Sequence, residues 1–581
     1  MERLAAAYVG ALRELIEHGR RRVAALLPGL KEAEDVYPLT PLQGGMLFHS
    51  LMAPESGVYV NQLTCALAAD LDPGLFRQAW ERIVERHTVL RTAFLWDGLD
   101  EPLQIVHRRV SLPWRELAGE DRFEELRLAE QRAPMPLDRA PLTRFALVRR
   151  DGGFGFVWTF HHLLLDGWSL PLLMRELATV YAALREGREP ILPPARPFAD
   201  YVAWLRRRDP AREEAFWRSE LAGFTAPNSL GVVAPAREEG ASGYAEHHLQ
   251  LSREVTAELQ SLAARHKLTL QTVTLGAWAL LAGRYSGQED VVFGNTVSGR
   301  PADLPGVEAM AGMFINTLPA RARVDDAQPL APWLRKLQER QLAWREHEHS
   351  PLALVQRWSA VPAGSPLFET LYVFENYPSA DVADGGLGIG DLRSHESTNY
   401  PVTLLLTAAD HVGLRLMTDR ARVDEDEAPR LLGHLAAFLA GMAEGLERLA
   451  GEVGMLTAAE TLQLRAWNGT DVSYDLDRPL HAWIEDQVRR TPEAVALAFE
   501  GEELTYAELD RRSNRLARLL QDRGCGPESR VGVLLERSNE LLIALHGILK
   551  AGAAYVPLDP EHPADRLAFQ DDDARLRLIV T

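Results

Sequence analysis

Two adjacent histidines, His161 and His162, are followed closely by Asp166 and Gly167, in the order His-His-Leu-Leu-Leu-Asp-Gly. A neutral imidazole, with a reference pKa of about 6.5, can accept a proton from an attacking amine or hydroxyl group, or hold that group in position. A carboxylate and a flexible glycine lie beside the pair in a short turn. These four residues are therefore the candidate site for chemistry that moves a proton.

Three uses of this pair are open. A metal site would need both rings on one ion, yet adjacent residues of a strand point to opposite faces. Two packed histidines would be the ordinary outcome, but Asp166 would then need a cation, such as an arginine from elsewhere, to offset its burial. Acyl transfer gives the rings different roles, one facing a cleft and one neutral in the core. The sequence has no Gly-x-Ser-x-Gly segment, which favours direct attack of one bound substrate on another over a serine acyl-enzyme.

Local pattern predicts the elements that hold the pair. The run Phe156-Val-Trp-Thr-Phe160 predicts a buried strand that ends at the histidines. Ser169 is expected to cap the next helix, because Pro171 is tolerated in a first turn and leucines recur after it at helical spacing. The pair is thus predicted at the open end of a rigid strand, a common place for catalytic groups.

Composition narrows the function classes. The chain has 581 residues and a net charge of −19, which argues against nucleic acid or an anionic membrane as partner. Its two cysteines, Cys65 and Cys525, suggest neither disulfides nor a cysteine metal site, which fits a reducing cytoplasm. The N-terminus lacks the apolar core of a signal peptide, and the most apolar window, 273–283, predicts a buried helix and not a membrane span.

Four segments are predicted along the chain. Residues 1–35 are expected to form a charged linker helix, and 36–215 a first lobe. A break over 231–246 is rich in glycine, proline and alanine. The helices and strands expected after it follow an order faintly similar to that of the first lobe, so 216–455 is taken as a second lobe. The character changes near 456, and the segment 456–581 ends on a strand without partners, as a domain cut from a longer chain would.

Two further elements are expected inside the lobes. A helix is predicted from Phe198 to near Pro210, and a strand over 312–321.

With these stretches in view, the chain resembles the condensation domains of nonribosomal peptide synthetases. The family signature His-His-x-x-x-Asp-Gly is intact at 161–167, and the resemblance covers roughly 36–455. Six further segments match the family in order: 40–46, 86–94, 198–204, 312–321, 349–351 and 368–378. The resemblance implies an α/β fold of two chloramphenicol-acetyltransferase-like lobes that form a V with a central tunnel.

The resemblance also implies roles for individual residues. His162 would be the catalytic histidine that faces the tunnel, and His161 a supporting one. Asp166 would be structural, in an ion pair with an arginine of the second lobe, for which Arg300 is the candidate. Gly167 would line the tunnel, where a side chain would crowd the acceptor thioester.

The implied reaction is peptide-bond formation between groups carried on two 4′-phosphopantetheine arms. The amine of an aminoacyl thioester on a downstream carrier domain would attack the thioester of an upstream carrier, without intrinsic cofactor or metal. Residues 456–581 resemble the start of an adenylation domain through 467–470, 504–509 and 549–560. The phosphate-loop motif of that family is absent, so adenylation is not expected from this segment. A carrier motif, Gly-Gly-x-Ser, is also absent, so carriers and the rest of the adenylation domain would be partners.

Alternatives to this function are an epimerization domain, an inactive condensation-like recruitment domain and a glycerolipid acyltransferase. The first would carry a Glu-Gly-His-Gly-like segment, which is absent; the second usually has a degraded histidine motif; the third would favour a membrane segment and a basic surface. The segment Pro-Leu-Thr-Pro-Leu-Gln-Gly-Gly-Met, 38–46, further resembles condensation domains that accept a D-configured donor.

Overall fold

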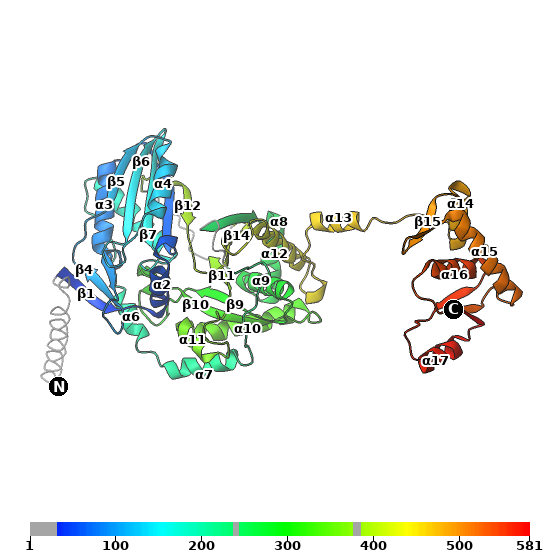
Figure 1. Ribbon diagram of the computed structural model, residues 1–581. Coiled ribbons are helices and arrows are strands. Elements are labelled where there is room, and N and C mark those ends of the chain that lie inside the picture. Colours follow the sequence, from blue (N-terminus) through cyan, green and yellow to red (C-terminus); the bar gives the residue numbers. More distant parts are fainter. Residues whose placement is uncertain (1–31, 236–242, 376–384, 409) are drawn as a thin grey trace. The chain divides into compact units, whose positions relative to one another are not determined.

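The computed structural model describes residues 32–235, 243–375, 385–408 and 410–581 (Figure 1). The chain divides into two compact units, Met1–Leu462 and Gln463–Thr581. The linker helix expected over 1–35 lies almost wholly outside the described residues. The first unit contains two lobes, each a sheet covered by helices, and it holds the candidate site.

The first lobe is built on a five-stranded mixed sheet with strand order β12-β2-β7-β6-β5. Its strands are β12 (Gly390–His395), β2 (Val60–Leu67), β7 (Gly153–His161), β6 (Thr143–Arg150) and β5 (Trp114–Ala118). A smaller sheet consists of β1 (Ala33–Pro38), β4 (Leu103–His107) and β3 (Thr92–Leu95). The helices of this lobe are α2 (Pro41–Met52), α3 (Pro73–Arg86), α4 (Arg122–Arg132), α5 (Ser169–Arg185) and α6 (Ala199–Leu205).

Strand β7 follows the predicted alternation and spans the predicted run. Phe156 and Trp158 point toward α3, where their rings pack on Trp80 at centroid distances of 5.8 and 4.8 Å. Val157 points to the other face and packs against Leu126 of α4. Burial of these large rings anchors the strand whose end carries the histidines.

The second lobe is built on a six-stranded sheet with order β10-β9-β11-β13-β14-β8. Its strands are β8 (Tyr244–Gln250), β9 (Asp290–Val297), β10 (Asn316–Arg323), β11 (Thr370–Glu375), β13 (Val402–Ala408) and β14 (Val412–Asp419). Its helices are α7 (Pro210–Glu220), α8 (Arg253–His266), α9 (Leu270–Ser286), α10 (Leu330–Glu346), α11 (Leu352–Trp358) and α12 (Glu427–Ala443). Helix α9 contains the window 273–283, which is buried throughout, as predicted.

Two segments of the second lobe cross into the first. Strand β12 pairs antiparallel with β2, so the edge of the first sheet is closed by a strand from later in the chain (Figure 1). The segment 304–314 packs into the core of the first lobe through apolar residues that include Met310 and Phe314. Gly312 allows this approach, because a Cβ there would lie 2.2 Å from a ring carbon of Phe198. The two lobes are therefore interlocked.

Three local expectations differ from the structure. Ser169 is the first residue of α5 and not its cap. The helix from Phe198 does not continue to Pro210; α6 ends at Leu205, and Asp209 caps a new helix, α7, which begins at Pro210. The strand expected over 312–321 begins only at Asn316, because 312–315 belongs to the segment that crosses between the lobes.

The second unit contains a hairpin and a small parallel sheet. The hairpin is β15 (Val495–Phe499) with β16 (Glu502–Thr505), and the sheet is β18 (Ala554–Pro557), β17 (Arg530–Val533) and β19 (Leu578–Val580), in that order. Its helices are α14 (Leu480–Arg490), α15 (Tyr506–Asp522), α16 (Asn539–Lys550) and α17 (Ala564–Ala574), and α13 (Ala458–Trp467) spans the division between the units. Over the described parts of both units, the search for helices of membrane-spanning length and apolarity found none.

Candidate active site

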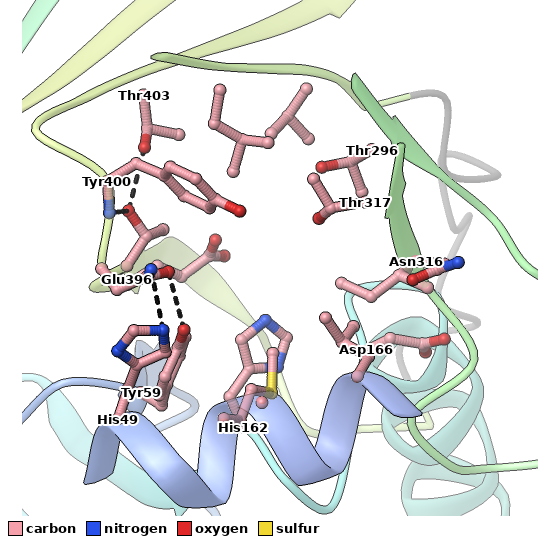
Figure 2. Close-up of a pocket in the computed structure, with 18 of the residues that line it drawn as sticks. His49, Tyr59, His162, Asp166, Thr296, Asn316, Thr317, Glu396, Tyr400 and Thr403 are labelled. Atoms are coloured by element: carbon pink, nitrogen blue, oxygen red, sulfur yellow. Dashed lines mark hydrogen bonds between the residues drawn. The ribbon is translucent and has the colours of Figure 1, made fainter. Parts of the chain in front are cut away.

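His162 lies just after β7 and borders a cavity of about 620 Å³ within the first unit. Its backbone N–H donates to the carbonyl of Tyr59 at 2.8 Å, which extends the β2–β7 ladder by one residue. Nδ1 of its ring lies 2.6 Å from the carbonyl oxygen of Leu165. A carbonyl oxygen only accepts, so Nδ1 carries the hydrogen and Nε2 of the neutral ring keeps a free lone pair. Figure 2 shows the ring directed into the cavity.

His161 points the other way and is only 2% exposed. Its Nδ1 accepts the backbone N–H of Leu163 at 3.2 Å, and its Nε2 lies 3.3 Å from Oγ of Ser50, which donates to the carbonyl of Met46. Burial, with a smaller contribution from neighbouring His162, lowers the pKa of His161 to about 3. The ring is therefore neutral at physiological pH and connects β7 to α2.

Asp166 lines the cavity but is buried, with 1% exposure. Its Oδ1 accepts the backbone N–H of Ser169 at 2.9 Å and lies 3.2 Å from Nη2 of Arg300, while its Oδ2 accepts the backbone N–H of Phe314 at 3.2 Å. Figure 2 shows the carboxylate directed away from the His162 ring. This carboxylate is occupied by bonds that tie the turn to the second lobe.

Arg300 extends from the second lobe to Asp166, and both terminal nitrogens of its guanidinium have hydrogen-bond partners. Its Nη1 donates to the carbonyls of Val307 and Met310 at 2.6 and 2.9 Å, and its guanidinium stacks over the Phe314 ring at 3.9 Å. A side chain fixed by so many contacts can define the position of its partner.

Ser169 takes a different part from the predicted one. Its backbone N–H is the donor that Asp166 accepts, so the carboxylate of Asp166 satisfies the start of α5. The hydroxyl of Ser169 donates to Asp166 Oδ1 at 2.6 Å and accepts the backbone N–H of Gly312 at 3.0 Å. Gly167, the remaining predicted site residue, lines the cavity beside His162.

The cavity lies between the lobes, and both of them line it. The first lobe contributes residues of α2, β2 and β7, and the second lobe contributes residues of β9, β10, β11 and β13 and of the segment 396–400. A second cavity of about 280 Å³ shares Thr296, Ile315 and Val373 with the first. Because these three residues line both, the second cavity lies next to the first.

The second-lobe wall holds polar residues that sequence reasoning did not assign to the site. Tyr59 donates from its hydroxyl to Oδ1 of Asn399 at 2.8 Å, and Asn399 lies 3.3 Å from Nε2 of His49 (Figure 2). Glu375 and Glu396 also line the cavity. One local pattern in the sequence could have indicated Glu375. It follows Leu371 and Val373 at alternate positions of β11, so all three face the same side of the strand.

Metal ligands do not gather in this region. Within the ranges that the structure describes, no group of three or more His, Cys, Asp or Glu side chains could hold a metal ion.

Two lobes of sheet and helix around a shared cavity, with the His162 imidazole on its wall, define a chloramphenicol-acetyltransferase-like fold. The first condensation domain of the calcium-dependent antibiotic synthetase, solved with a substrate analogue, superposes on 73% of this chain and all of that domain, with a TM-score of 0.63 and 22% identity. A solved nonribosomal peptide synthetase bound to AMPPNP matches 95% of this chain and 58% of its own, with a TM-score of 0.75 and 23% identity. These likenesses show the fold.

The chain belongs to the condensation-domain family, whose model matches residues 33–465. The model for AMP-binding enzymes matches 484–581. One linear gramicidin synthase protein of Brevibacillus parabrevis is 40% identical over 615 aligned positions that cover the whole chain and 8% of that protein. Another protein of the same synthase is 42% identical over 95% of the chain and 11% of its own length. The chain thus spans about a tenth of the length of these curated relatives.

Proposed function

We propose that the first unit forms an amide bond between two groups, each delivered as a thioester on a phosphopantetheine arm. The observation that carries this proposal is the free Nε2 of His162 in a cavity that both lobes line. A donor carrier domain and an acceptor carrier domain would each present its arm to this cavity. Holding both arms in one cavity would supply much of the rate by proximity alone.

The proposed step balances without a cofactor. The amine nitrogen of the acceptor attacks the thioester carbonyl carbon of the donor, a C–N bond forms and the C–S bond breaks. The amine loses one proton and the departing thiolate takes up one. Nε2 of His162 either accepts the proton from the amine or only holds the amine in position while the proton passes to the thiolate. His162 is the proposed catalytic residue; His161, Asp166, Gly167 and Arg300 hold the turn around it.

Replacement of His162 tests the function. His162→Ala is expected to reduce formation of the condensed product on the acceptor carrier at least about 100-fold, because a positioned acid–base group contributes ~10²–10⁴ in rate. Mass spectrometry of the carriers after incubation with the full chain is the readout. His248→Ala is the matched control, since His248 is exposed on β8 and lies outside the cavity. Near-normal product from His162→Ala would overturn the assignment.

The same incubation separates the alternatives. An epimerization domain would exchange the α-hydrogen of a carrier-bound aminoacyl group in D₂O without forming a new bond. A recruitment domain would do neither. We expect condensation without exchange.

Donor configuration is a finer part of the proposal. The segment 38–46 supports a D-configured donor, and its Gln43 is buried and holds the turn by donating to the carbonyl of Leu163 at 2.9 Å. Donor carriers loaded with D- or L-peptidyl groups test this, and a preference for the L-donor would refute it. We also propose the two lobes predicted from the sequence at 36–215 and 216–455, with their division moved to Pro210, because α7 packs into the core of the second lobe.

A further inference from the structure

One part of the second-lobe wall combines an apolar surface with carboxylates. On β11, Leu371, Val373 and Glu375 alternate toward the cavity, and Leu405 of β13 lies beside Val373 in the parallel register. Glu396 follows β12 and points into the space above the His162 ring (Figure 2). A ligand that extends along this wall therefore meets an aliphatic stretch and then acidic groups.

This wall has more carboxylates than positively charged groups to balance them. Oε1 of Glu396 accepts the hydroxyl of Ser394 at 2.9 Å, and its Oε2 lies 3.6 Å from Nη2 of Arg415 on β14. The backbone of Glu375 belongs to the β11–β13 ladder, but no hydrogen bond or ion pair joins its carboxylate to a residue that the structure describes. Burial, and then the charge of Glu396, raise the pKa of Glu375 to about 7, as expected for a carboxylate without a counterion.

The neighbouring charges do not supply the missing cation. Nδ1 of His395 lies 3.0 Å from the carboxylate of Glu246, so any positive charge on His395 is already paired with Glu246. Arg415 is paired with Glu396 and its charge also acts on Glu375, but one guanidinium can balance only one negative charge of the two.

An independent feature of the first lobe points into the same place. Asn61 of β2 lines the cavity and is only 4% exposed, yet its Oδ1 has no hydrogen-bond partner. The β12–β2 register places His395 opposite Gln62, so Asn61 lies beside Glu396. A buried amide oxygen without a hydrogen-bond donor is destabilising unless a ligand supplies the donor.

We propose that Glu375, Glu396 and Asn61 form a binding site for a primary ammonium group of the carried substrate. All three residues present acceptor oxygens, and an ammonium group brings three N–H donors and one positive charge. The aliphatic stretch before the carboxylates would hold the carbon chain that bears it. This inference rests on the proposed function, because that function brings an aminoacyl group into the cavity.

Two sources could provide the ammonium group: the α-amine of the aminoacyl group, or an amine at the end of its side chain. Three amide-linked, unreactive probes on aminopantetheine separate them. Norleucyl carries only the α-ammonium, Nα-acetyl-lysyl only the side-chain ammonium, and Nα-acetylnorleucyl neither. Isothermal titration with the full chain gives the dissociation constant of each.

We expect at least one ammonium probe to bind tenfold or more tightly than the neutral probe, and the tighter of the two identifies the source. Glu375→Gln is expected to remove that advantage and to leave the neutral probe within about twofold. Glu369→Gln is the matched control, because Glu369 directly precedes the same strand but is paired with Arg422 at 3.0 Å and lies outside the cavity.

Equal binding of all three probes to the unaltered chain would overturn the ammonium site, and this comparison needs no variant to fold. Equal weakening of all probes by Glu375→Gln would overturn it as well. The proposed function fails separately: it falls if His162→Ala still condenses, whatever the probes show.

Discussion

Nη2 of Arg300 lies 3.2 Å from Oδ1 of Asp166, and this pair joins the two lobes directly behind the turn that carries His162. Both side chains are at most 5% exposed. The pair leaves the imidazole facing the cavity while the carboxylate next to it in sequence is used to brace the turn. The bonds of Asp166 to Ser169, Phe314 and Arg300 explain why its carboxylate is directed away from the His162 ring, although the two residues are close in the chain (Figure 2).

Asp166→Asn should lower the free energy of unfolding by about 3 kcal/mol, because it leaves Arg300 buried without its counterion. Denaturant unfolding of the chain measures this. Asp70→Asn is the control, since the pair of Asp70 with Arg185 is exposed and should change stability by less than about 0.5 kcal/mol. Unfolding like that of the unaltered chain, together with full loss of condensation, would instead indicate a direct catalytic role for Asp166.

His161 should make the fold less stable in acid. Its pKa is lowered to about 3 in the folded chain, below the reference value of about 6.5, so the unfolded chain binds the extra proton between these limits. The contribution of His161 to the free energy of unfolding is therefore fully present above about pH 6.5. It falls as the pH drops toward 3, by up to ~1.4 kcal/mol per pH unit. Unfolding of His161→Asn across this window checks it.

Because asparagine does not titrate there, the stability gap between His161→Asn and the unaltered chain should be widest near pH 8 and narrow on acidification. His248→Asn should leave the pH dependence as it is, since that ring is exposed. A gap that stays constant with pH would show that folding does not lower the pKa of His161.

Gly312→Ala should destabilise the first unit by about 1–3 kcal/mol, because the added methyl group would collide with Phe198 and push the crossing segment away from Ser169. Thermal unfolding compares it with Gly454→Ala, where a Cβ would meet nothing within 4 Å. An unchanged midpoint for Gly312→Ala would show that the segment can shift freely.

Tyr59→Phe should cost about 1 kcal/mol, because it removes one hydrogen bond between the lobes, from the Tyr59 hydroxyl to Asn399. Hydrogen exchange of residues 397–400 should also become faster, since this segment loses a tie to the first lobe. Tyr474→Phe, at an exposed position of the second unit, is the control. Unaltered exchange in 397–400 would mean that the β12–β2 pairing and the bonds of the Ser397 hydroxyl to Tyr59 N–H and the Gly57 carbonyl hold the segment without the Tyr59 hydroxyl.

Much of the local structure was predictable because it depends on short-range pattern. Strand β7, the opposite orientation of the two histidines and the buried helix α9 all follow from spacing within the chain. The helix predicted to end near Pro210 failed because a proline with a preceding aspartate starts a helix as readily as it stops one. Ser169 was misassigned because Asp166, three residues earlier, supplies the acceptor first.

The sequence by itself determined which groups could do chemistry: an imidazole pair at a strand end, with a carboxylate that needed a cation. The tertiary structure alone decided how those groups are used. It brought Arg300 to Asp166, placed β12 beside β2, and set Glu375, Glu396 and Asn61 around one cavity. These contacts join segments from different parts of the chain, and no local periodicity encodes them, because their geometry depends on how two separately packed lobes interlock.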